Sequence, residues 1–185
     1  LLILVILIWT ALGLVRIPAE ADRKYRRHAV AILHLVAITA VAGAFVAGLD
    51  AGLIYNTFPL MNGYVIPPDY AFAEPFWINL FENPTAVQFN HRMIAILTVV
   101  SIFWLLIRAL RASDIEPRTR LAIHSLAAIS VIQVALGIST LLAQVPVSLG
   151  AAHQGGAALT LVAAVWVLFE VSGPRSQPGR RRIKA

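Results

Sequence analysis

The sequence predicts an all-α integral membrane protein, built as a four-helix transmembrane bundle plus the end of a preceding transmembrane helix. Of the 185 residues, 59% are hydrophobic and 13% are charged. A soluble domain carries about 25% charged residues. The apolar residues also fall in runs of about 20, the length that a helix needs to cross a bilayer. This composition excludes a soluble globular protein and a disordered chain.

The first apolar run covers residues 1–15 and is interrupted only by Thr10. It has no initiator methionine, no basic segment before it and no cleavage site, so it does not resemble a signal peptide. We expect residues 1–15 to be the end of a truncated transmembrane helix. The sequence is then a fragment of a longer chain.

Four further runs are long enough to span a membrane and predict a bundle over residues 29–171. They cover residues 29–49, 87–110, 121–143 and 147–169. The long outer loop, residues 50–86, is rich in proline, asparagine and aromatic residues, and its function is open between a lid and an anchor at the membrane surface. Residues 172–185 are predicted to form a disordered basic tail.

The basic residues predict the orientation of these spans. Fourteen of the fifteen lysines and arginines fall at one end of the bundle if the helices alternate, and the outer loop has none. The positive-inside rule places the basic end in the cytoplasm, or in the mitochondrial matrix. The expected location is therefore the bacterial inner membrane, or the mitochondrial inner membrane if the protein is eukaryotic. Nothing resembles a nucleic-acid recognition module, so nucleic acid is not an expected partner.

Two histidines lie at a similar depth in parallel spans. His91 is about one turn, and His153 about two turns, from the outer end of its run. Alternate helices of such a bundle face each other diagonally, which suits two axial ligands on one haem iron. A zinc site needs three or four protein ligands, and the spans show no third at that level. The alternative is a pair of neutral histidines that bond to neighbouring helices.

A weak internal repeat supports the pairing. The same three residue types, alanine, threonine and tryptophan, follow each histidine at offsets of four, seven and thirteen. They are Ala95, Thr98 and Trp104 after His91, and Ala157, Thr160 and Trp166 after His153. The neighbouring small residues, such as Gly43, Gly137 and Gly156, suit close helix approach or room for a macrocycle.

Three other ionisable residues lie within the runs. Arg92 directly follows His91, and an unpaired charge at that depth is costly, so we expect an anionic partner for it. His34 and His124 lie near the inner side. Their role is open between ligands of a second haem and ordinary hydrogen bonding between helices.

Several phrases together resemble haem A synthase, in particular the cysteine-free type of alphaproteobacteria and mitochondria. They are AGLDAG (47–52), YNTFPLMNG (55–63), NLFENP (79–84), QFNHR (88–92), LGISTLL (136–142), QVPV (144–147) and HQ (153–154). The chain contains no cysteine, so the cysteine pair that some bacterial members carry in an outer loop is absent from this segment.

The resemblance implies an enzyme with eight membrane helices in two halves. The amino-terminal half holds haem O and the catalytic residues, and the carboxy-terminal half holds a bis-His haem b that passes electrons. The enzyme oxidises the C8 methyl of haem O to the formyl group of haem A for cytochrome oxidase. On this mapping, residues 1–15 end the fourth helix and the catalytic residues lie in the missing half. His91 and His153 are the iron ligands of haem b, and Arg92 pairs with a propionate.

The resemblance also implies the partners: the lipid bilayer, haem O and haem A, haem O synthase and an electron donor. Whether the protein forms a homo-oligomer stays open. Two rival classes remain. One is a b-type cytochrome membrane subunit that acts only in electron transfer. The other is a transporter, which is disfavoured because the prolines lie in loops or at helix ends rather than in the middle of the spans.

Overall fold

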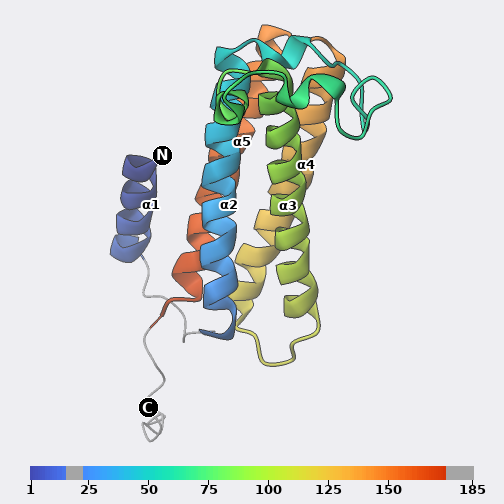
Figure 1. The fold of residues 1–185 in the computed structure, drawn as a ribbon. Helices are drawn as coiled ribbons and strands as arrows, with labels where there is room; N and C mark the ends of the chain where they lie inside the picture. Colours follow the sequence, from blue (N-terminus) through green and yellow to red (C-terminus); the bar gives the residue numbers. More distant parts are fainter. Residues whose placement is uncertain (16–22, 174–185) are drawn as a thin grey trace, which may run out of the picture.

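The computed structural model describes residues 1–15 and 23–173, and this part of the chain is helical (Figure 1). It contains no β-strand. Its α-helices are α1 (Leu2–Val15), α2 (Arg23–Gly48), α3 (Pro84–Leu110), α4 (Pro117–Leu142) and α5 (Val147–Glu170). The predicted all-α class is confirmed. Most of the predicted basic tail lies outside the described residues.

Helices α2 to α5 are each long and apolar enough to cross a membrane. They match the four predicted runs, but α2, α3 and α4 begin three to six residues earlier than the runs do. In α2 and α4 most of the extra residues are polar, since these helices continue into the headgroup region beyond the hydrophobic run. The apolar helix α1 is shorter, at 14 residues.

Local signals explain where α3 and α4 begin. The Asn83 side chain caps α3 by accepting hydrogen bonds from the backbone N–H groups of Thr85 and Ala86. Pro84 follows at the first helical position, where a missing N–H costs nothing. Pro117 occupies the same position in α4.

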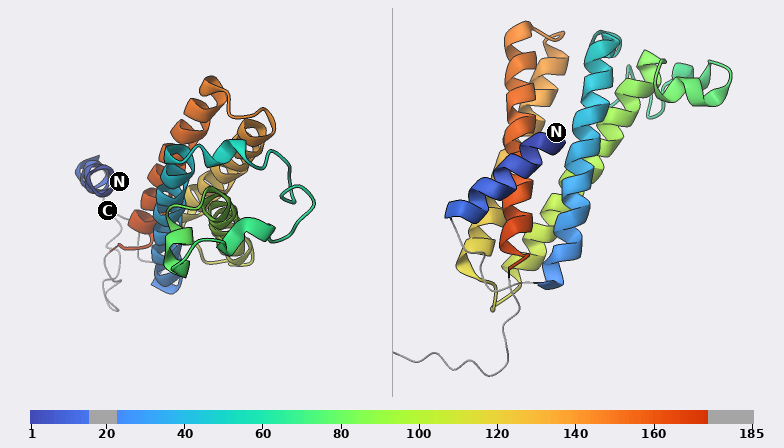
Figure 2. Two further views of the ribbon diagram at one scale, coloured as in Figure 1. Left: turned by 45° about the horizontal axis from the view of Figure 1, so that its top comes forward. Right: turned by 90° about the vertical axis from the view of Figure 1, so that its left-hand side faces the viewer.

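The four long helices form a closed ring of neighbours. Helix α2 packs against α3 and α5, and α4 packs against the same two helices. Consequently α3 and α5 lie diagonally across the bundle, as the two further views in Figure 2 show. Helix α1 packs beside α5, where the rings of Trp9 and Phe169 meet edge to face at 5.3 Å.

The main cluster of buried hydrophobic side chains lies in the inner half of the bundle, the end at which α2 and α4 begin. Its members are Tyr25, Ala29, Ile32, Val36, Ile102, Leu105, Ala109, Ile115, Ala122, Ile123, Leu126, Ala127, Leu161, Ala163, Ala164, Val167 and Val171. No side chain is buried along residues 37–48, 89–97, 131–139 and 147–159. Toward that outer end the α2–α3 pair diverges from the α4–α5 pair (Figure 2, right). The bundle therefore has few buried side chains at this level, between the inner cluster and the outer end, where Ala86, Val87 and the loop residue Met61 are buried.

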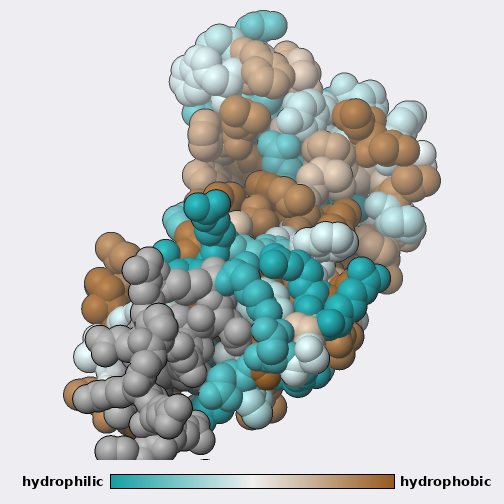
Figure 3. Space-filling model, turned by 90° about the horizontal axis from the view of Figure 1, so that it is seen from below, coloured by the Kyte–Doolittle hydropathy of each residue, from teal (hydrophilic) through white to brown (hydrophobic). Residues whose placement is uncertain are grey.

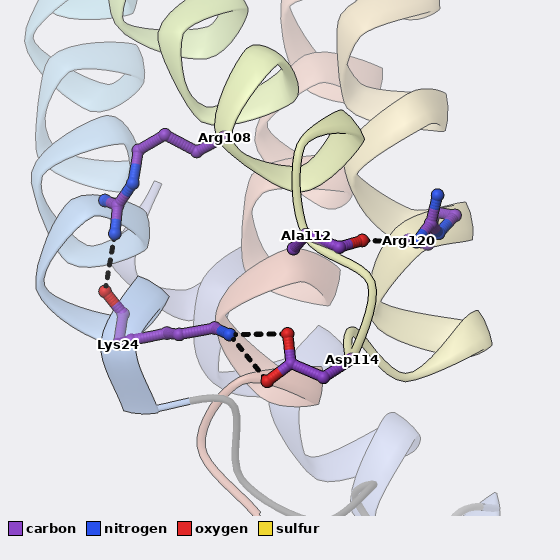
Figure 4. A network of polar contacts seen from close by, with 5 residues as sticks. All are labelled: Lys24, Arg108, Ala112, Asp114 and Arg120. Atoms are coloured by element: carbon purple, nitrogen blue, oxygen red, sulfur yellow. Dashed lines mark hydrogen bonds and ion pairs between the residues drawn. The ribbon is translucent and has the colours of Figure 1, made fainter.

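Polar contacts join the helices at the inner end (Figure 4). The Lys24 ammonium pairs with Asp114 at 2.9 Å, and this contact lowers the pKa of the Asp114 carboxyl. Arg108 donates to the Lys24 carbonyl at 3.2 Å, and Arg120 donates to the Ala112 carbonyl at 2.9 Å. Hydrophilic residues gather on this face (Figure 3). Because the Lys24–Asp114 pair is exposed, water screens it and its contribution to stability is small.

The outer loop is ordered but mostly irregular. It contains three short 3-10 helices, η1 (Ala51–Leu53), η2 (Pro68–Ala71) and η3 (Phe76–Leu80). Buried Asn79 bonds the Ala73 backbone through both its amide oxygen and its amide nitrogen, and Asn83 donates to Asn79 at 2.9 Å. Six aromatic side chains of the loop are exposed, namely Phe58, Tyr64, Phe72, Phe76, Trp77 and Phe81. Their exposure suits contact with lipid headgroups.

Candidate functional site

The two histidines of the predicted pair lie at the same level of the outer half. His91 is the eighth residue of α3 and His153 is the seventh of α5. Both side chains are half-buried. The two imidazoles lie within electrostatic range of each other across the bundle. The fold thus brings together, from diagonal helices, two residues that are 62 positions apart in the sequence.

Each imidazole packs against a glycine of the helix that precedes it in the chain. A Cβ atom on Gly43 of α2 would lie 3.1 Å from Cε1 of His91. A Cβ atom on Gly137 of α4 would lie 2.7 Å from Cε1 of His153. Distances below 3.0 Å essentially never occur for real Cβ atoms. The α2–α3 pair and the α4–α5 pair therefore repeat one arrangement, in which a histidine ring fills the space over a glycine.

The Nδ1 atoms of both rings are buried, and neither has a hydrogen-bond partner of regular geometry among the described residues. A backbone group of the facing helix nevertheless interacts with each ring, that of Thr39 with His91 and that of Gln133 with His153. Buried ring nitrogens without a regular partner are unusual. They mark these two side chains as more than packing residues.

The internal repeat is partly retained in three dimensions. Thr98 and Thr160, seven residues after each histidine, are both buried. Each hydroxyl donates to the carbonyl four residues earlier in its own helix, at 2.8 Å. The tryptophans differ, because Trp104 is 57% exposed whereas Trp166 donates to Glu170. The two halves of the site are therefore similar around the histidines and diverge further along the helices.

Gln133 of α4 is a site residue that the sequence analysis missed. Its amide nitrogen donates to the carbonyl of His153 at 3.0 Å. Its amide oxygen lies over Gly156, where a Cβ atom would collide with it. The available signal was a glutamine inside an apolar run, four residues before Gly137.

Arg92 fastens the outer loop to α3. Its guanidinium donates to the carbonyl of Tyr55 at 2.7 Å and to the carbonyl of Thr57 at 2.9 Å. Gln88 donates to the same Tyr55 carbonyl at 3.1 Å. We expected an anionic partner, but within the described chain the hydrogen bonds of Arg92 go to two neutral carbonyls. The loop folds back over the helix end, so carbonyl dipoles take the place of a carboxylate.

Tyrosine side chains hold the same loop from the other side. The Tyr55 hydroxyl donates to Asp69 at 3.2 Å, and the Tyr70 hydroxyl donates to Asn90 of α3 at 3.1 Å. Burial and the neighbouring Asp69 carboxylate raise the pKa of Tyr55. The phenol therefore stays a protonated donor at neutral pH, and the loop lies fixed beside the His91 end of α3.

The second histidine pair does not converge. His34 and His124 are exposed, and Nδ1 of each lies against the carbonyl four residues earlier in its own helix, at 2.8 and 2.7 Å. His28 bonds to Ser101 at 3.0 Å and links α2 to α3. The bonds of His34 and His124 therefore lie within one helix each, and not between helices as in the alternative to a second haem site.

The two imidazoles of His91 and His153 suit a metal cofactor that already carries most of its ligands. Among the residues that the structure describes, no three His, Cys, Asp or Glu side chains cluster to hold a metal ion. Two imidazoles alone do not complete a zinc site. They do complete the axial positions of an iron that a porphyrin already holds by four nitrogens.

Comparisons with known proteins agree with this chemistry. A family described as cytochrome oxidase assembly protein matches residues 1–165. The chain is 50% identical over 139 residues to the heme A synthase of Nitrosospira multiformis, covering 74% of this chain and 38% of that protein. It is 43% identical over 169 residues to heme A synthase COX15 of Homo sapiens, covering 89% and 41%. The chain thus spans less than half the length of these relatives.

Proposed function

Because the chain belongs to the cytochrome oxidase assembly protein family, whose members matched here are heme A synthases, we propose that it supplies the electron-relay site of a haem A synthase. The reaction is the oxidation of the C8 methyl of haem O to the formyl group of haem A. A methyl-to-formyl conversion is a net oxidation, so electrons must leave the substrate. No residue of this chain is assigned to the catalytic step, which we attribute to the other half of the enzyme.

The geometry around the histidines carries the proposal. His91 and His153 approach one another from diagonal helices, each over a glycine. Around them, residues 37–48, 89–97, 131–139 and 147–159 include no buried side chain. We propose that these two side chains hold the iron of a haem b, which supplies one-electron transfer when bound. An iron held by both His91 and His153 would have no open position for oxygen chemistry.

Arg92 and the outer loop would complete the site. A guanidinium has five N–H donors, and within the described chain Arg92 donates to two carbonyls, those of Tyr55 and Thr57. The remaining donors suit a haem propionate, because guanidinium–carboxylate bonds are charge-assisted. The loop that Arg92 holds would then cover the edge of the group and limit the access of water.

The proposed membrane and partners of the protein follow from the same proposed function. The protein is a multi-pass membrane protein, and we place it in the bacterial inner membrane or its mitochondrial counterpart. Its partners would be the bilayer, haem O and haem A, an electron donor and haem O synthase, with a homo-oligomer open. The second candidate is a b-type cytochrome subunit that acts only in electron transfer. The histidine pair fits it equally well, and the absence of haem O conversion by the intact protein would favour it.

The test replaces His91 or His153 by alanine in the intact, membrane-reconstituted protein. Each variant should lose the low-spin spectrum of a bis-His haem, because one axial ligand is missing. His34→Ala is the matched control, since it removes an exposed histidine at the inner level of α2. It should leave the spectrum unchanged. If both His91→Ala and His153→Ala keep a low-spin bis-His spectrum, the ligand assignment is wrong.

A further inference from the structure

We infer that Gly43 and Gly137 are positioning residues for the two histidines. Gly43 leaves the Thr39 carbonyl of its helix accessible to the Nδ1–H group of His91. Gly137 leaves the Gln133 carbonyl accessible to the Nδ1–H group of His153 in the same way. The inference rests on the proposed ligand role of His91 and His153. It adds the groups that would fix the rotation and the tautomer of each ring.

The helix geometry explains why a glycine is needed. In an α-helix the carbonyl of residue i accepts the N–H of residue i+4. The Thr39 carbonyl is therefore paired with the N–H of Gly43, and the Gln133 carbonyl with that of Gly137. A carbonyl oxygen has a second lone pair. A Cβ atom at residue i+4 lies beside this lone pair, and a glycine there leaves it accessible from the neighbouring helix.

The α2–α3 pair shows this arrangement. The His91 ring lies over Gly43, with Cε1 3.1 Å and Nδ1 3.6 Å from the position of the missing Cβ. Its buried Nδ1 has no hydrogen-bond partner of regular geometry among the described residues. The Thr39 hydroxyl is engaged elsewhere, with the Leu35 carbonyl at 2.7 Å and with Thr98 at 2.9 Å. The Thr39 backbone is the acceptor that remains.

The α4–α5 pair repeats it with a tighter fit. Cε1 of His153 is 2.7 Å, and Nδ1 3.3 Å, from the position of a Cβ on Gly137. The backbone of Gln133 interacts with this ring. Because Gly43 and Gly137 each lie four residues after the carbonyl concerned, the two halves of the site share one local design. A chance packing defect would not be expected to occur twice in the same register.

The chemical consequence concerns the metal ligand itself. A histidine that donates from Nδ1 keeps Nε2 unprotonated, and Nε2 is then the ligating nitrogen. Donation to a carbonyl also makes the imidazole a stronger electron donor to iron. Such a bond stabilises the oxidised iron and lowers the reduction potential of the bound haem.

The test compares Gly43→Ala and Gly137→Ala in the haem-loaded intact protein. Each added methyl should push the ring off the carbonyl, and the reduction potential should rise. The low-spin g values in electron paramagnetic resonance should shift as well. The effect should be larger for Gly137→Ala, whose Cβ would be 2.7 Å from the ring against 3.1 Å for Gly43→Ala. Matched controls are Gly48→Ala in α2 and Gly150→Ala in α5, where a Cβ meets nothing within 4 Å. They should keep the wild-type values.

A further variant distinguishes the backbone acceptor from a side-chain acceptor. Gln133→Leu removes the amide oxygen but keeps the backbone carbonyl of that residue. If the carbonyl is the acceptor, the 15N chemical shift of His153 Nδ1 in the haem-free protein should stay that of a protonated nitrogen. A shift to a deprotonated nitrogen would overturn the assignment of the acceptor.

The outcomes separate this inference from the proposed function. If the histidine variants lose the bis-His spectrum while both glycine variants keep the wild-type potential and g values, the positioning role is wrong and the ligand role stands. If the histidine variants keep the spectrum, the ligand role itself fails. If Gly137→Ala retains no haem, Gly43→Ala decides, because its longer contact requires a shift of only a few tenths of an ångström.

Discussion

At the scale of single residues, the histidines of this chain differ in where Nδ1 points. In His34 and His124 the ring turns back to its own helix and bonds a carbonyl four residues earlier. In His91 and His153 the ring instead crosses to the neighbouring helix and lies over a glycine. The first arrangement satisfies the ring locally. The second aims it into the bundle, where two such rings can share one ligand.

The guanidinium of Arg92 provides a prediction at this scale. Arg92→Lys should loosen the outer loop, because an ammonium cannot reproduce the planar fork that bonds two carbonyls. Losing one charge-assisted bond at a partly exposed site costs about 1 kcal/mol, equivalent to about a fivefold faster opening of the loop. Hydrogen exchange at the Asn62 amide, which donates to Thr57, would report this change.

The control for this prediction is Arg108→Lys. Arg108 also donates to a backbone carbonyl, but at the inner end of the same helix. It should leave exchange in the outer loop unchanged. Haem retention should fall in Arg92→Lys and not in Arg108→Lys. Equal exchange rates and equal haem content in the two variants would remove both the fastening and the propionate role of Arg92.

The distance of each histidine from the end of its apolar run was enough to select His91 and His153 as a predicted pair. An apolar run fixes how far each of its residues lies from the membrane surface. This distance could not identify Gln133 as a neighbour, and Gly43 was named only as a small residue near the site, not as the residue over which the His91 ring lies. Those contacts depend on how each helix is rotated about its axis, and a nearly uniform apolar run carries no such information. The carbonyl partners of Arg92 were missed for a similar reason, since backbone acceptors leave no trace in a sequence.

At the scale of elements, the outer loop is joined to the turn between α4 and α5. Asn56 donates to the carbonyls of Gly52 and Leu141, at 2.7 and 2.9 Å. The turn itself carries Val145 in a left-handed conformation, with φ of 56°, which is unusual for a β-branched residue. A Cβ atom on Gly52 would lie 2.9 Å from Cγ2 of Val145. This contact links the α2–α3 pair to the α4–α5 pair beside the candidate site.

The close approach at Gly52 predicts coupling between two substitutions. Gly52→Ala should destabilise the bundle by about 1 kcal/mol, the lower end of the usual cost of overpacking. In a Val145→Gly background the obstructing methyl is absent, so the same substitution should cost almost nothing. The free energies of unfolding in mixed detergent micelles, measured for both singles and the double variant, give the coupling energy. Gly48→Ala, which meets no neighbour, controls for a general glycine effect. Additive effects of the two changes would show that the contact is unimportant.

The elements themselves were predicted well where the signal was hydrophobic. The four long helices follow from apolar runs of membrane length, and their ends differ because polar residues extend the helices beyond the hydrocarbon. The outer loop was predicted as irregular from its prolines and asparagines. The internal order of the loop was not predicted. Turn-forming residues such as Asn79 and Asn83 show that a loop is irregular, but they do not indicate which side chains bond to each other.

At the scale of the whole molecule, the inner half of the bundle holds the main buried cluster, whereas the helix segments around the two histidines have no buried side chain. The residues of the inner cluster, such as Ile32, Leu126 and Leu161, bury one another and give the bundle its rigidity. The outer halves hold the histidines, the glycines and the attached loop. A bundle organised in this way gains stability at one end and keeps space at the other. That division fits a protein whose outer half is completed by a bound group.

The charge distribution gives the last prediction, which concerns how the molecule is oriented. The chain contains no cysteine, so single cysteines can be introduced without background. Ala71→Cys lies in η2 of the outer loop, and Ser113→Cys lies in the α3–α4 connection; both positions are exposed. Because the basic residues gather at the Ser113 end, the positive-inside rule places that end in the cytoplasm. A membrane-impermeant maleimide should therefore label Ala71→Cys in intact bacterial cells, and Ser113→Cys only after the membrane is permeabilised. The reverse pattern would invert the topology and place both histidines near the cytoplasmic face, where an outer-leaflet relay site could not lie.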